Sequence, residues 1–237
     1  MAKDVMTFKS QQKHFFLMGK IQREEAYEYY LNYLNYLKEV RVTPRNIDKI
    51  LFLRIVGEAF PVINYKYRIA EIEPSMDSKG KLYYKEGQKV ITGLSYFEWK
   101  EKAEALAPEC GSQLANLYEL FLWYFYRVAK GYWTLNDVCQ KLSVESNYFD
   151  CPTSSHRIEV SGKRSVGGAN DGIGNTQKLV TCEGISSRFI EPNSLYINCG
   201  GSYGHYSYSF PVAEFKSGCR SDIEVIHEFS TGVVVLK

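Results

Sequence analysis

The chain has 237 residues, of which 45% are hydrophobic and 24% charged, and its formal net charge is +2. This composition is typical of a globular protein with a sizeable buried core, and it excludes a disordered or collagen-like chain. The charge stays small on either side of Asp150, which does not indicate bulk electrostatic binding of nucleic acid.

The first half of the sequence has the periodicity of helices. Apolar and aromatic residues recur every three or four positions over residues 7–40, which predicts an amphipathic helix. Its tyrosine-rich tract, residues 27–37, suits either core packing or a seam for a partner helix. Thr43 and Pro44 predict the start of a second helix. Pro61 should end or kink that helix, residues 62–72 are predicted to resume as helix, and residues 81–91 suit a small hairpin.

Two further helices have clear signals. Ser95 with Glu98 three residues later forms the pattern of a capping box. Residues 112–130 are apolar nearly all round, which predicts a buried central helix. Its expected core residues are Leu117, Phe121, Leu122 and Phe125. Its most apolar stretch, residues 114–128, contains Glu119 and is too short for a membrane span of about 20 residues, and the first residues contain no apolar signal-peptide core. We therefore expect a soluble cytoplasmic protein without a membrane partner.

Residues 134–149 resemble a helix-turn-helix of the kind that regulators and excisionases use. Thr134 begins a helix, Leu142 leads into a tight Ser-Val turn, and a second helix would follow. That resemblance implies DNA contacts, which would fall to Lys141, Ser146 and Asn147. A structural helix followed by a linker explains the same residues.

The character of the sequence changes near Asp150. Short apolar or alternating runs between Gly, Pro, Asn and Ser predict five strands, at residues 156–161, 177–182, 194–199, 206–215 and 223–236. The predicted fold is therefore α+β, with a helical domain over residues 1–149. A β-rich domain over residues 150–237 should form a mostly antiparallel sheet or a small barrel.

A glycine-rich loop over residues 161–178 is the first candidate for ligand binding. Closely spaced glycines let backbone amides approach an anion such as phosphate, although no P-loop or dinucleotide fingerprint is present. The charges expected at such an anion site are Lys163, Arg164, Lys178 and Arg188. A flexible connection between two strands is the alternative.

Cysteine and histidine give weaker signals. The six cysteines are scattered without a CxxC pair, so we expect free thiols, and neither a metal nor a cofactor. Cys199 and His205 lie close enough in sequence to suggest a nucleophile and its base, with Asp222 or Glu224 orienting the base. A buried cysteine in a glycine-rich hairpin explains the same pattern.

The sequence therefore leaves three functions open. The first is a non-enzymatic interaction or recognition protein, of phage or mobile-element origin, that binds a macromolecular partner. The second is an enzyme whose active site lies in the β half and acts on a phosphate-bearing or nucleic-acid substrate. The third is a DNA-binding regulator that uses residues 134–149.

Overall fold

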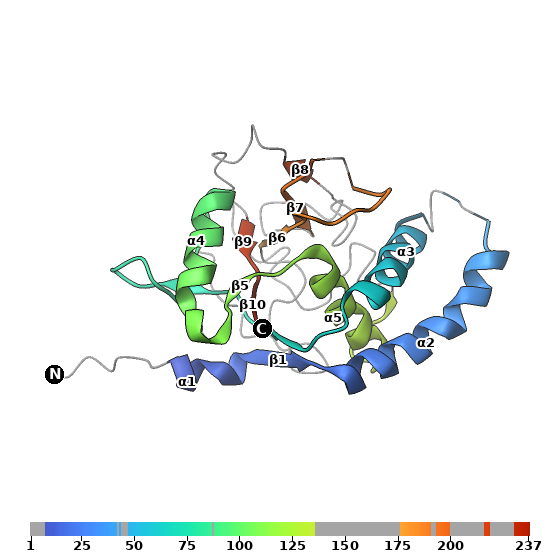
Figure 1. Cartoon of the computed structure of the whole chain (residues 1–237), viewed down its shortest axis with the longest axis horizontal. Coiled ribbons are helices and arrows are strands. Elements are labelled where there is room, and N and C mark those ends of the chain that lie inside the picture. The colour runs from blue at the N-terminus through green and yellow to red at the C-terminus, as the bar shows by residue number, and fades with distance from the viewer. Residues whose placement is uncertain are drawn as a thin grey trace, which may run out of the picture.

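The protein has the α+β fold that its sequence predicts: the described helices all lie before residue 130, and the described elements after residue 176 are all strands (Figure 1). A computed structural model describes residues 8–41, 43, 47–86, 88–135, 176–190, 193–199, 216–218 and 230–237. The described strands form two four-stranded sheets and one two-stranded sheet, and none of these closes into a barrel.

The helix predicted over residues 7–40 is divided in two. The short helices α1 (Phe8–Gln11) and η1 (Gln12–His14) precede the strand β1 (Phe15–Met18), and only then does the long helix α2 (Lys20–Glu39) begin. Four consecutive apolar residues suit a strand that is covered on both faces. Gly19 then caps α2, where its backbone N–H donates to the side chain of Gln22 at 3.0 Å.

The second helix is followed by a strand rather than by more helix. α3 (Ile47–Val62) ends one residue after Pro61, as expected, but residues 67–70 form β2 (Tyr67–Ala70), so the predicted helical continuation is wrong. Residues 82–83 also pair differently from expectation. β4 (Leu82–Tyr83) pairs with β3 (Ser75–Met76) instead of forming a hairpin within residues 81–91.

The two helices with clear signals are confirmed. Ser95 and Glu98 form the predicted capping box of α4 (Tyr96–Leu106). The 3-10 turn η2 (Pro108–Cys110) and the strand β5 (Gln113–Leu114) lead to α5 (Leu117–Ala129), which Asn116 caps. All four residues predicted as core on this helix have 0% exposure.

The later strands contribute to two sheets. β6 (Gln177–Thr181), β7 (Tyr196–Cys199), β8 (Lys216–Gly218) and β9 (Ser230–Gly232) form a sheet in the order β8-β7-β6-β9, in which β6 and β9 are parallel. The last strand, β10 (Val234–Leu236), joins the other sheet, in the order β1-β2-β10-β5. This sheet contains strands from both sides of the predicted boundary at residues 149–150, which itself lies outside the described residues.

The sheet β1-β2-β10-β5 separates two hydrophobic cores. Because side chains alternate along a strand, Tyr67 and Ile69 face a core formed with α2, α3 and α5, whereas Ala70 faces a core formed with α4. Figure 1 shows α4 and α5 on opposite sides of β5 and β10. Each face of this sheet thus packs against one of the two cores, although Arg68 on β2 is exposed.

Candidate functional site

A groove with mainly apolar walls lies between α2 and α3. It has a volume of about 500 Å³ and is lined by Arg23, Tyr27, Tyr30, Gly57, Phe60 and Pro61. Six large apolar side chains are exposed in the described part of the chain. Five of these lie on α2 or α3, among them Tyr27, Leu31 and Val62 with 46%, 43% and 54% exposure. We call the concavity itself the α2–α3 groove.

Gly57 allows Tyr30 of α2 to approach the backbone of α3 closely inside the groove. A Cβ atom at this position would lie 2.2 Å from the hydroxyl of Tyr30, so only glycine lets this tyrosine pack against the backbone of α3. Glycine in the interior of a helix costs about 1 kcal/mol relative to alanine. The ring of Phe60 then contacts both Tyr30 and Tyr27, with centroid distances of 5.4 and 5.0 Å. The wall of the groove is therefore aromatic.

The charges at the rim of the groove already have partners. Arg23 donates to the backbone carbonyl of Tyr65 at 2.5 Å, and Glu24 pairs with Lys20 at 3.6 Å on the same helix. An exposed pair of this kind contributes little stability. Among the lining residues, Arg23 and Glu24 carry one charge of each sign, which suits a guest without a strong net charge.

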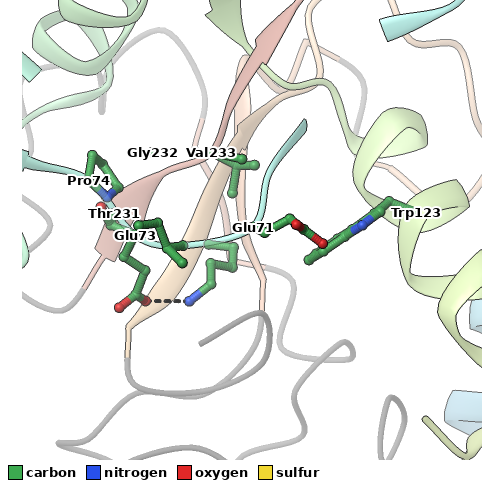
Figure 2. A pocket seen from close by; sticks show the side chains of 10 residues that line it. Glu71, Glu73, Pro74, Trp123, Thr231, Gly232 and Val233 are labelled. Atoms are coloured by element: carbon green, nitrogen blue, oxygen red, sulfur yellow. Dashed lines mark hydrogen bonds and ion pairs between the residues drawn. The ribbon is translucent and has the colours of Figure 1, made fainter. Parts of the chain in front are cut away.

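A second candidate is a polar cavity where residues 71–73 meet β6 and β9 (Figure 2). Glu73 and Lys178 form an ion pair there, and their side chains are only 2% and 6% exposed. Thr176 joins them, because its hydroxyl and backbone N–H donate to Glu73 while its carbonyl accepts from Lys178. The dashed line from Glu73 in Figure 2 marks this ion pair.

A second ion pair, of which only the arginine is fully buried, includes Glu71, a residue that also lines this cavity. Arg127 pairs with Glu71, and the arginine is 1% exposed. Its guanidinium lies over the rings of Phe16, Trp123 and Tyr132 at 4.8, 5.5 and 5.2 Å. Burial lowers the pKa of Arg127 to about 10, which still leaves it charged at neutral pH. The acid and the base in each pair thus neutralise one another.

The polar cavity is too small for an organic substrate. Its volume is about 20 Å³, and a single water molecule needs roughly 10–15 Å³ measured in this way. Trp123 Nε1 and Thr231 Oγ1 are buried in its wall without a hydrogen-bond partner among the described residues. Room for one water beside two such groups indicates a structural polar cluster that ties distant segments together.

The residues predicted from the sequence are not gathered at one site. Lys178, an expected anion ligand, is buried in the ion pair with Glu73. Arg188 is exposed, with its guanidinium 4.9 Å from the ring of Phe189. The remaining candidate site residues lie outside the described residues: Lys141, Ser146, Asn147, Lys163 and Arg164. Most of the helix-turn-helix candidate, residues 134–149, lies outside them as well. The anion site and the DNA-binding surface stay predictions.

The cysteines that the structure describes are unpaired. Cys110, Cys182 and Cys199 are free thiols, as expected. Cys199 is fully buried, burial raises the pKa of its thiol, and its suggested partner His205 lies outside the described residues. Within the described ranges, no group of three or more His, Cys, Asp or Glu side chains is arranged to hold a metal ion.

The α2–α3 groove left only a partial signal in the sequence. The tyrosine-rich tract on α2 indicated a core seam or a partner seam, and the structure gives it both environments: Tyr30 is buried and Tyr27 is exposed. Gly57 was missed, although a glycine inside an apolar helical pattern often has a packing reason.

Comparisons with known proteins add no functional information. No protein-family model matches the chain, and neither a curated protein sequence nor a solved structure matches it significantly. Among the described helices, none combines the length and the apolar character that crossing a membrane requires.

Proposed function

We propose that this protein is a non-enzymatic interaction protein that binds an apolar helical segment of a macromolecular partner in the α2–α3 groove. The observation that carries the proposal is a concavity of about 500 Å³ with an aromatic wall of Tyr27, Tyr30 and Phe60, on two helices that carry five of the six large exposed apolar side chains of the described residues. Pockets that hold a ligand or anchor side chains span about 300–1,000 Å³.

The shape and the chemistry of the groove favour this class of guest. Two neighbouring helices with an apolar furrow between them match the mode in which an amphipathic helix inserts anchors at successive turns. Tyrosine at the rim supplies contact area at a low cost in conformational entropy. Because Arg23 and Glu24 place one charge of each sign at the rim, a segment of strong net charge would meet a like charge there as well as an opposite one.

A peptide selection with matched variants tests the proposal. Helical peptides are selected from a displayed library on the folded protein, and their affinities are measured by fluorescence anisotropy. Tyr27→Ser removes the exposed wall of the groove. Tyr36→Ser is the control, because Tyr36 lies on the same helix with 49% exposure, close to the 46% of Tyr27, but does not line the groove.

We expect Tyr27→Ser to weaken the selected peptides by about tenfold or more, the effect of losing an interface anchor worth more than about 1 kcal/mol, and Tyr36→Ser to have no effect. A selection without binders, or equal losses in both variants, would refute the groove as a partner site. Sedimentation of the free protein tests whether the groove binds a second copy of this chain instead of a partner. A dimer that Tyr27→Ser dissociates would show that it does.

A further inference from the structure

A second concave site, independent of the α2–α3 groove, lies at the rim of the sheet β1-β2-β10-β5. Its volume is about 240 Å³, and its walls include Gln12, Leu17, Lys66, Arg68, Leu236 and Lys237. Three of these side chains are cationic, and no acidic side chain lines the site within the described part of the chain. We call it the cationic pocket.

Arg68 occupies an unusual position for an arginine. It lies on β2, between β1 and β10, and its neighbours across the two strand pairs are Leu17 and Leu236. Opposite charges often face one another across paired strands, but here the guanidinium has an aliphatic residue on either side. Neither Arg68 nor Lys66 has a described carboxylate within 4.0 Å. The two cations are therefore available to an outside anion.

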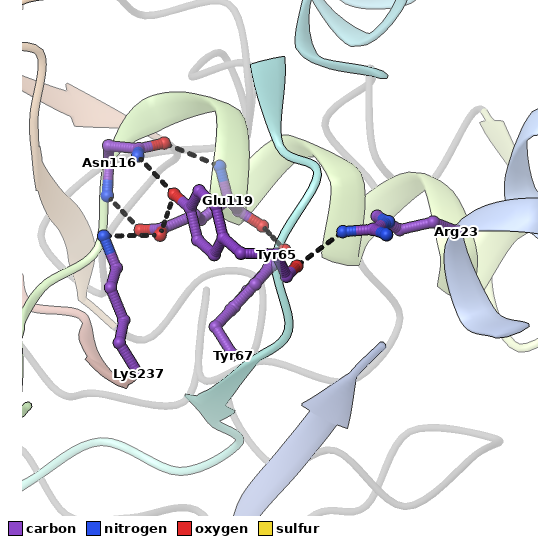
Figure 3. A network of polar contacts seen from close by, with 6 residues as sticks. All are labelled: Arg23, Tyr65, Tyr67, Asn116, Glu119 and Lys237. Atoms are coloured by element: carbon purple, nitrogen blue, oxygen red, sulfur yellow. Dashed lines mark hydrogen bonds and ion pairs between the residues drawn. The ribbon is translucent and has the colours of Figure 1, made fainter. Parts of the chain in front are cut away.

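Lys237 is held in place at the edge of the same pocket (Figure 3). Its ammonium lies 3.0 Å from the fully buried carboxylate of Glu119 and 5.0 Å from the centre of the Tyr65 ring. Glu119 is itself fixed, because it accepts from the hydroxyl of Tyr65 at 2.6 Å and from the backbone N–H of Asn116 at 2.8 Å. Lys237 is thus a pre-positioned cation whose charge Glu119 partly offsets.

We propose that the cationic pocket binds the phosphate group of a small phosphomonoester. A phosphomonoester carries a charge of about −1.5 to −2 at neutral pH, which matches Lys66 and Arg68 together. The planar guanidinium of Arg68 can donate two parallel hydrogen bonds to phosphate oxygens. Leu17 and Leu236 beside it offer apolar surface to the organic part.

The size of the pocket limits the ligand. Its volume of about 240 Å³ is below the range of about 300–1,000 Å³ typical of drug-sized ligands, which favours a compact molecule. A phosphate group carried on a small apolar moiety fills both the charged and the aliphatic parts of the pocket. Inorganic phosphate would leave the leucines without a contact, and a carboxylate would leave one positive charge uncompensated.

Calorimetric titration with phenyl phosphate at low ionic strength tests this proposal, with inorganic phosphate, benzoate and phenol as comparison ligands. We expect Arg68→Gln to weaken phenyl phosphate by about tenfold or more, because a hydrogen bond to a charged group contributes roughly 1.5–3 kcal/mol. Arg54→Gln is the matched control, since Arg54 is an exposed arginine of α3 that does not line the pocket. It should leave the affinity unchanged.

The affinity should also rise between pH 5 and pH 7, because the second pKa of the phosphate is about 6 and the dianion is the preferred form. Thermal melting of each variant confirms that the fold is retained. Absence of binding, or an equal loss in Arg54→Gln, would overturn the site. Benzoate binding as tightly as phenyl phosphate would overturn the preference for phosphate, and equal affinity for inorganic phosphate would overturn the role of the leucines.

Discussion

The buried pair of Glu73 and Lys178 makes the most quantitative prediction. Lys178→Met keeps the length of the side chain but leaves a carboxylate that is 2% exposed without its cation. Removing one partner of a buried ion pair costs about 3–5 kcal/mol, because an uncompensated charge remains in a medium of low polarity. For a chain of 237 residues, each kcal/mol lowers the melting temperature by about 2–4 °C, so we expect a decrease of roughly 6–20 °C.

The double variant Glu73→Leu with Lys178→Met shows how much of the loss in stability comes from an unpaired charge and how much from lost packing and hydrogen bonds. Replacing both charges by apolar groups is often nearly neutral in free energy. Here Thr176, which is 0% exposed, loses its acceptor on Glu73, and an unsatisfied buried donor costs about 1–3 kcal/mol. We therefore expect the double variant to be less destabilised than Lys178→Met alone.

The assay is equilibrium unfolding in urea, followed by circular dichroism and by tryptophan fluorescence so that coincident transitions justify a two-state analysis. The reasoning would be refuted if Lys178→Met lost less than about 1 kcal/mol, since a properly buried charge cannot be orphaned so cheaply. It would also be refuted if the losses in unfolding free energy of the single variants Glu73→Leu and Lys178→Met simply added in the double variant.

Two further predictions concern Gly57 and the cysteines. Gly57→Ala should destabilise the protein by about 1 kcal/mol in urea melts, because the clash with Tyr30 outweighs the gain in helix propensity, and a gain in stability would contradict the tight packing of that tyrosine. Burial raises the pKa of Cys182 to about 12 and also raises that of Cys199, so both thiols of the native protein should be protonated near pH 8. They should therefore react with iodoacetamide far more slowly than Cys110, which is partly exposed. Peptide mapping by mass spectrometry checks the order of labelling, and early modification of Cys199 would contradict its burial.

The local features of the fold were predictable from the sequence. α5 follows from its nearly continuous apolar run, and α4 follows from the capping pair of Ser95 and Glu98. Strands β6 and β7 lie within the predicted ranges 177–182 and 194–199. In each case the signal lies within one turn or one strand, where periodicity and capping are decided by neighbouring residues.

The misread elements are those whose structure depends on distant partners. Phe15–Met18 is a short apolar run that suits either a strand or a helix, and pairing with β2 decides between them. β10 lies within the predicted strand range 223–236, but its pairing with β2 and β5, far back in the sequence, cannot be read from a local pattern. The same holds for Lys178, which was predicted to be a ligand-binding cation but is buried in an ion pair with Glu73.

The candidate sites follow the same division. The tyrosine-rich tract on α2 was visible, but its split into a buried and an exposed side depends on the approach of α3 at Gly57. The cationic pocket needs three strands in register before Lys66, Arg68 and Lys237 share one wall. Only the fold brings these residues together.

The most direct test of the proposed interaction function is a nuclear magnetic resonance titration of the isotope-labelled protein with a peptide from the helical library. The account predicts that the largest shift changes fall on backbone amides of residues 23–31 and 57–62, which form the α2–α3 groove. Shift changes that left those residues unaffected and clustered on α4 or on the sheet β8-β7-β6-β9 would contradict it.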